Sequence, residues 1–103
     1  MKHLKHLEHL IENKKVFFNY MNENYTIFQY SNLFFRDLQY AIISYFEMKE
    51  EPVKYALAEK LTKEFISKMI VENELTQIDT KSWKINFEVG IKRDIETEGV
   101  NNE

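Results

Sequence analysis

The stretch SWKINFEVGIK, residues 82–92, limits the folds open to this chain more than any other segment. Its hydrophobic side chains fall on every second residue, and the residues between them are polar or glycine. Because successive side chains of a β-strand point to opposite faces of a sheet, this alternation predicts a strand with one hydrophobic face. The hydrophobic positions are Trp83, Ile85, Phe87, Val89 and Ile91.

A single strand leaves its backbone N–H and C=O groups unpaired, so the predicted strand needs a neighbour. Three segments could supply it: residues 75–79 folded back over Thr80 and Lys81, residues 16–21, or the same strand of a second chain. The first pairing closes the shortest loop and therefore costs the least entropy. A two-stranded ribbon would still expose its edges, which favours pairing with another molecule.

Hydrophobic residues recur at helical spacing in the segments before this strand. Residues 2–21 carry one such stripe, and residues 53–73 carry another directly after Pro52, which suits the first turn of a helix. The alternative for residues 16–30 is a β-hairpin, because β-branched and aromatic residues there flank the turn-forming cluster NEN. We expect the helix, since its stripe continues without interruption through residue 21.

Residues 26–48 are predicted to form the central helix. Thr26 and Gln29 match a capping box, the side-chain pattern that opens many helices. Most of the circumference of this helix is hydrophobic, so other elements must cover it on several sides. Its polar residues collapse into one narrow stripe on a helical wheel: Gln29, Asn32, Arg36, Gln39 and Glu47.

These elements predict an α+β fold that is mainly α. Three helices, the central one apolar, are followed by a C-terminal β-strand or hairpin. With 103 residues the chain has the length of one domain, which we assign to residues 1–93. Residues 94–103 contain four acidic residues and no basic one, and we expect them to form an acidic flexible tail.

The composition excludes several classes of function. The chain has no cysteine, so disulfides, zinc–thiolate sites and thiol catalysis are excluded, and it has only two glycines, too few for a phosphate-binding loop. No hydrophobic run approaches the roughly 20 residues of a membrane-spanning helix. We therefore expect a cytoplasmic protein that is not an enzyme, has no cofactor and does not interact with a membrane.

The opening repeat KHLKHLEHLIE places a leucine after each of three histidines. Residues three apart on a helix do not quite share a face, so His3, His6 and His9 cannot converge on one metal ion. We expect a solvated row of histidines opposite a docking face made of Leu4, Leu7 and Ile11, and no metal site. Among the carboxylates, Asp37 has hydrophobic neighbours, and a structural hydrogen bond explains it more simply than catalysis.

The abundance of aromatic residues favours a protein interface, because amphipathic rings are enriched at such surfaces. We therefore predict a non-enzymatic protein-binding module that acts as an inhibitor, adaptor or regulator and self-associates, with a dimer favoured. The predicted interface consists of the strand residues Trp83, Ile85, Phe87, Val89 and Ile91 and of the central-helix tyrosines Tyr40 and Tyr45. Other tyrosines of the same class are Tyr25, Tyr30 and Tyr55.

The alternative function is a nucleic-acid-binding regulator that uses the lysine-rich N-terminal helix. Its basic patch would consist of Lys2, Lys5, Lys14 and Lys15. Four lysines form a small electrostatic footprint, and the net charge of −3 opposes it, so nucleic acid is not the expected partner. The composition, rich in Asn, Lys, Ile and Tyr, is typical of proteins from AT-rich phage or mobile-element genomes.

Overall fold

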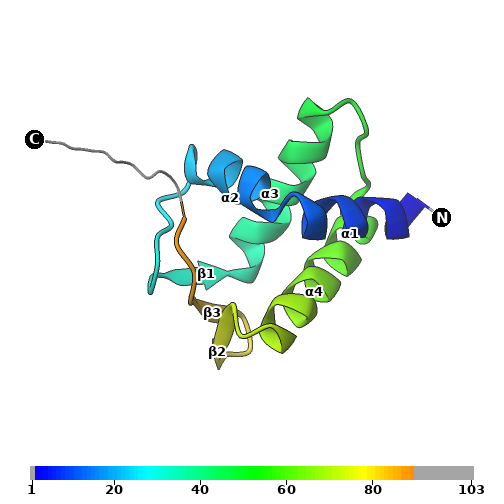
Figure 1. Cartoon of the computed structure of the whole chain (residues 1–103). Coiled ribbons are helices and arrows are strands. Elements are labelled where there is room, and N and C mark those ends of the chain that lie inside the picture. The colour runs from blue at the N-terminus through cyan, green and yellow to red at the C-terminus, as the bar shows by residue number, and fades with distance from the viewer. Residues whose placement is uncertain (1, 90–103) are drawn as a thin grey trace, which may run out of the picture.

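A computed structural model of the chain describes residues 2–89, with side chains from residue 5 onward. Within that range lie four helices and one antiparallel three-stranded sheet (Figure 1). The elements in chain order are α1 (Lys2–Glu12), α2 (Lys14–Asn22), β1 (Asn32–Phe34), α3 (Phe35–Met48), α4 (Tyr55–Val71), β2 (Leu75–Asp79) and β3 (Ser82–Ile85). The predicted class, α+β and mainly α, is confirmed. The predicted acidic tail and Ile91 lie outside the described residues.

The sheet has the strand order β1–β3–β2. Of the three possible neighbours of the predicted strand, the local hairpin is the one observed: β2 and β3 pair over a turn at Thr80 and Lys81. Regular pairing ends at Ile85, so β3 is shorter than the predicted strand of residues 82–92. Since β3 has a neighbour on each side, it cannot also pair with β3 of a second chain.

The predicted central helix begins late, at Phe35, and the prediction of a capping box at Thr26 and Gln29 is wrong. The backbone in this region bonds to other segments instead of forming helical turns. Tyr30 donates its N–H to the carbonyl of Ile85 (2.7 Å), and Ile85 donates in return to the carbonyl of Ser31 (3.0 Å). These bonds lead the chain into β1, the strand that sequence periodicity did not reveal.

The predicted first helix is divided in two at Asn13. The backbone of Asn13 leaves the helical conformation, with φ −117° and ψ 35°, while its Nδ2 donates to the carbonyl of His9 (3.0 Å), which also accepts the Asn13 N–H (2.9 Å). After this break α1 packs on α4, and α2 packs on α3. The alternative hairpin for residues 16–30 is wrong, since the residues up to Asn22 are helical.

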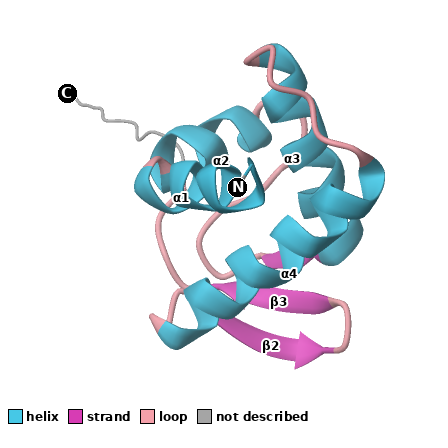
Figure 2. Ribbon diagram, turned by 90° about the vertical axis from the view of Figure 1, so that its right-hand side faces the viewer, coloured by secondary structure: helices cyan, strands magenta, loops and turns pink. Residues whose placement is uncertain are grey.

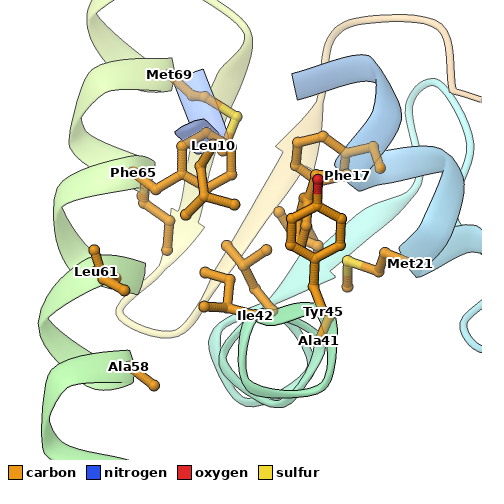
Figure 3. Packing of buried hydrophobic residues seen from close by; sticks show 14 of the residues in the cluster. Leu10, Phe17, Met21, Ala41, Ile42, Tyr45, Ala58, Leu61, Phe65 and Met69 are labelled. Atoms are coloured by element: carbon orange, nitrogen blue, oxygen red, sulfur yellow. The ribbon is translucent and has the colours of Figure 1, made fainter. Parts of the chain in front are cut away.

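Helices α3 and α4 pack against each other, and α4 runs across one face of the sheet (Figure 2). Aromatic rings from three helices meet in the core between them. Phe17 of α2 lies edge-on to Tyr45 of α3 and to Phe65 of α4, with ring centroids 5.2 and 5.9 Å apart (Figure 3). Much of the aromatic content of the chain therefore serves its own core.

The docking face of α1 differs from the predicted one. Leu10 is fully buried and His6 is buried beside it, whereas Leu7 and Ile11 are half-buried. His6 packs edge-on against Phe46 of α3, with ring centroids 4.4 Å apart. Because α1 lies over both α3 and α4, its histidine side is covered as well as its leucine side.

The ends of α3 and α4 form the same motif. In α3, Glu51 donates its N–H to the carbonyl of Phe46 (2.8 Å) and Glu50 donates to the carbonyl of Glu47 (3.0 Å), the bonding pattern of a Schellman cap. In this motif the residue just after the helix adopts the left-handed backbone conformation, with a positive φ. In α4 that residue is Asn73, with φ 62°, and in α3 it is Glu50, with φ 63°.

A glycine should therefore suit the end of α3 better than the glutamate does. Glu50→Gly is expected to raise the free energy of unfolding by about 1 kcal/mol, because glycine has no Cβ to clash in this conformation. The control Glu47→Gly lies inside the helix and is expected to lower it by about as much. Urea denaturation followed by circular dichroism measures both. A loss of stability in Glu50→Gly would contradict the assigned cap.

Candidate functional site

Three of the six described residues of the predicted interface lie inside the protein. Trp83 and Ile85 of β3 point into the core, with 5% and 0% of their surface exposed, and Tyr45 of α3 is exposed by 1%. The alternating pattern therefore marks the face that packs on this chain's own helices. Ile85 and Tyr45 are therefore not available to a partner in this fold, and only a small part of Trp83 reaches the surface.

The remaining members of the predicted interface differ in position. Phe87 and Val89 are half-buried, and the Phe87 ring contacts that of Phe18 with centroids 5.1 Å apart. Tyr40 is exposed on α3. Among the described members of the predicted set, Tyr40 is thus the one that remains a surface residue.

The predicted nucleic-acid patch is divided by the break at Asn13. Lys5 is exposed on α1 and Lys15 on α2, while the side chain of Lys2 lies outside the described part. The Nζ of Lys14 lies 2.5 Å from Glu74 Oε1 and is also 3.9 Å from Glu72 Oε1. Because these carboxylates compensate its charge, Lys14 contributes little to attracting phosphates.

Two histidines of the opening repeat contact α3 and the loop that follows it, so the expectation of a solvated row is wrong for them. The Nε2 of His9 lies 2.7 Å from the hydroxyl of Tyr45, and the Nε2 of His6 lies 3.3 Å from the carbonyl of Glu51. Within residues 2–89 no group of three or more His, Asp or Glu side chains could hold a metal ion. The histidines here contribute to packing and hydrogen bonding.

Burial lowers the pKa of His9 below its ordinary value of 6.5, and Lys49 and His6 lower it further while Glu51 and Glu12 oppose them. The unfolded chain therefore binds this proton more readily than the folded protein. Its contribution to stability is fully present above about pH 6.5 and is lost as the pH falls through the pKa of the folded state.

This shift predicts a measurable pH dependence. The free energy of unfolding should fall as the pH decreases below about 6.5, because His9 must lose its neutral form beside Tyr45. His9→Gln retains a hydrogen-bonding group but cannot titrate, so its stability should depend less on pH in this range. Urea denaturation at a series of pH values compares the two proteins. Equal pH dependence would exclude His9 as the titrating group.

Asp37 lies in the first turn of α3 and is half-buried. A carboxylate at this position interacts favourably with the positive end of the helix dipole. Its place beside hydrophobic residues is therefore explained by this interaction with the helix dipole.

A surface groove along α4 is the strongest candidate site in the described part of the chain. Two adjoining depressions, of about 320 and 300 Å³, share Phe35 at the start of α3. One lies between α3, α4 and the hairpin turn, and the other between α4 and the sheet. We call both together the aromatic groove, lined by Phe35, Arg36, Gln39, Tyr40, Tyr55, Glu59, Lys63, Ile66, Ser67, Ile70, Gln77, Thr80, Lys81 and Trp83.

Four aromatic residues line the groove. The rings of Phe35 and Trp83 lie side by side where the depressions meet, with centroids 6.5 Å apart. Tyr40 and Tyr55 flank the first depression and are 41% and 60% exposed. The guanidinium of Arg36 lies over the Tyr40 ring, 5.7 Å from its centroid, which holds both side chains against the surface.

Two buried donors among the groove-lining residues lack a partner. Gln39 and Trp83 are exposed by only 4% and 5%, and neither Gln39 Nε2 nor Trp83 Nε1 forms a hydrogen bond within the described part of the chain. A buried N–H without an acceptor costs about 1–3 kcal/mol, so native proteins rarely retain one without a reason. The sequence reading missed Gln39, because the helical wheel had placed it on a solvated stripe.

Sequence reasoning missed most of this groove for the same reason that it missed β1. Phe35 was assigned to the middle of a helix, although it stands at the N-terminus of α3, where it meets the hairpin turn. Its N–H donates to the carbonyl of Lys81 (3.0 Å), a contact between residues far apart in the chain. The available signal was the high number of tyrosines, which correctly indicated Tyr40 and Tyr55 as surface candidates.

Comparisons with protein-family models, with curated proteins and with solved structures find no match to this chain. No helix among the described residues is both long and hydrophobic enough to cross a membrane. The assignment of a function therefore depends on the geometry of the groove.

Proposed function

We propose that this chain is a non-enzymatic protein-binding module, acting as a small inhibitor, adaptor or regulator, and that the aromatic groove holds a segment of its partner. The observation that supports this proposal is the pair of exposed tyrosines, Tyr40 and Tyr55, beside a groove floored by Phe35 and Trp83. Tyrosine combines a large hydrophobic ring with a hydrogen-bonding hydroxyl, and such residues dominate the binding energy of many protein interfaces.

Site-specific crosslinking tests this function. A photoreactive phenylalanine derivative placed at Tyr55 should crosslink the partner in cells of the native host, and mass spectrometry identifies the product. The same derivative at Val16, which is equally exposed on α2, serves as the control and should not crosslink that protein. Genes that flank this one supply a short list of candidate partners, since small regulators often accompany their targets.

The identified partner then allows a quantitative measurement. The double variant Tyr40→Ala, Tyr55→Ala is expected to weaken binding by about 30-fold or more, as removal of interface tyrosines commonly costs 2 kcal/mol or more. A variant with the exposed residues Val16 and Met48 replaced by alanine should retain its affinity. If both double variants weakened binding equally, or neither did, the groove would not be the binding surface.

We further propose that the protein self-associates, as a dimer, in the cytoplasm. Support comes from β2, which forms an edge of the sheet and whose residues from Thr76 to Asp79 are exposed. An exposed edge offers unpaired backbone groups to a second strand. Analytical ultracentrifugation should show a mass that rises with concentration, and Ile78→Lys should shift it toward the monomer. A constant monomer mass would contradict self-association.

A further inference from the structure

Resting on the proposed function, we propose that the occupant of the aromatic groove is an extended acidic segment of the partner protein. Its carboxylates would meet Arg36 and Lys81, and its oxygen acceptors would pair with the buried donors of Gln39 and Trp83. Charge, shape and unpaired hydrogen-bonding groups support this assignment independently.

The charge of the groove is opposite to that of the chain. Three basic residues and one acidic residue line it, whereas the whole chain carries a net charge of −3. The Nζ of Lys63 lies 3.5 Å from Glu59 Oε2, so these two charges compensate each other. Arg36 and Lys81 have no acidic partner among the described residues, and they leave the first depression, which both of them line, positive.

The shape of the groove suits an extended chain. Its α4 wall consists of residues on one face of the helix, from Tyr55 through Glu59, Lys63 and Ile66 to Ile70. With a rise of 1.5 Å per residue this wall is about 22 Å long, which an extended peptide of about seven residues would span.

The two unpaired donors favour an occupant that presents oxygen acceptors. The amide of Gln39 and the indole of Trp83 both donate through N–H, so the complementary group is an oxygen acceptor. Carboxylates and backbone carbonyls of an acidic peptide supply such acceptors in an extended row. The Gln39 amide sits on a side chain with several rotatable bonds and can turn toward an acceptor in the groove.

The single tryptophan of the sequence lines this groove, so its fluorescence reports on groove occupancy. The probe is a short synthetic peptide in which glutamate alternates with phenylalanine, and the comparison peptide has glutamine in place of glutamate. Titration of the full chain with the acidic probe should change the Trp83 emission to saturation. Affinity should decrease as salt increases, because exposed charge pairs are screened.

Charge reversals inside and outside the groove distinguish binding of the acidic probe at the groove from general electrostatic attraction to the protein. The double variant Arg36→Glu, Lys81→Glu should weaken binding of the probe by about tenfold, whereas Lys60→Glu, Lys84→Glu should leave it nearly unchanged. The control lysines are exposed and line neither depression. Both double variants change the net charge by the same amount.

Three results would overturn the proposal. Equal weakening by both double variants would show general electrostatics, and equal binding of the glutamine peptide would remove the requirement for charge. Tighter binding of the probe to a full-length variant with Asp94, Glu96 and Glu98 neutralised would assign the groove to the chain's own acidic segment. If the crosslink at Tyr55 still formed in such cases, the groove would remain a protein-binding site with an occupant of different chemistry.

Discussion

Replacing Phe17 by alanine is expected to lower the free energy of unfolding by about 3–5 kcal/mol, the largest effect of any single substitution considered for this chain. Phe17 is fully buried, and its ring contacts Phe18, Tyr45 and Phe65 at centroid distances of 5.1, 5.2 and 5.9 Å. The packing of α2 against α3 and α4 therefore depends on this one side chain. Urea denaturation followed by circular dichroism and by near-ultraviolet signals measures the loss.

The preceding residue supplies a matched control for Phe17. Val16 lies on the same helix but is 55% exposed, so Val16→Ala should change the free energy of unfolding by no more than about 0.5 kcal/mol. A large loss of stability for Phe17→Ala and a small one for Val16→Ala would support the orientation of α2, in which Phe17 points into the core and Val16 points to solvent. If the two substitutions cost the same, α2 would have to be rotated from its position in Figure 3.

Replacing Leu10 by alanine is expected to cost about 2–5 kcal/mol, because this side chain is fully buried between α1 and the other helices. Leu7→Ala should cost clearly less, since Leu7 is half-buried and lies at the margin against α4. The same denaturation measurement compares the two variants, which differ only in the position of a lost leucine side chain.

This pair distinguishes the structure from the sequence reading of α1. Periodicity alone placed Leu7 and Ile11 at the centre of the docking face and left the histidines in solvent. The structure instead centres the face on Leu10 and His6. If Leu7→Ala lowered the free energy of unfolding more than Leu10→Ala, the result would support the docking face predicted from periodicity and contradict the observed one.

The elements that the sequence predicted well are those whose signal lies within the element itself. The alternation around Trp83 repeats at every second residue, and the helix after Pro52 repeats its hydrophobic face over several turns. These patterns predicted α4 and the strand β3 from local information, and the short loop favoured the pairing of β3 with β2. The alternation also predicted which face of β3 is hydrophobic, although it could not reveal whether that face meets a partner or the chain's own helices.

The features that were missed depend on contacts between distant residues. β1 contains only three residues, too few for a periodic signal, and it exists because Leu33 pairs opposite Trp83. Gln39 lies on a polar stripe of the helical wheel, yet the hairpin and α4 cover that side of α3. The sequence of Asn32–Phe34 does not indicate its pairing with β3, and that of Gln39 does not indicate its contact with the hairpin and α4. The candidate groove could therefore be identified only from the three-dimensional structure.

The order of strands in the sheet has a consequence for folding kinetics. The β2–β3 hairpin closes a two-residue turn and can form early, but pairing of β1 with β3 joins segments separated by roughly fifty residues. That pairing must wait until α3 and α4 have brought the segments together. We therefore expect the hairpin to gain structure before β1 docks, and native-state hydrogen exchange to release the amide protons of β1 first.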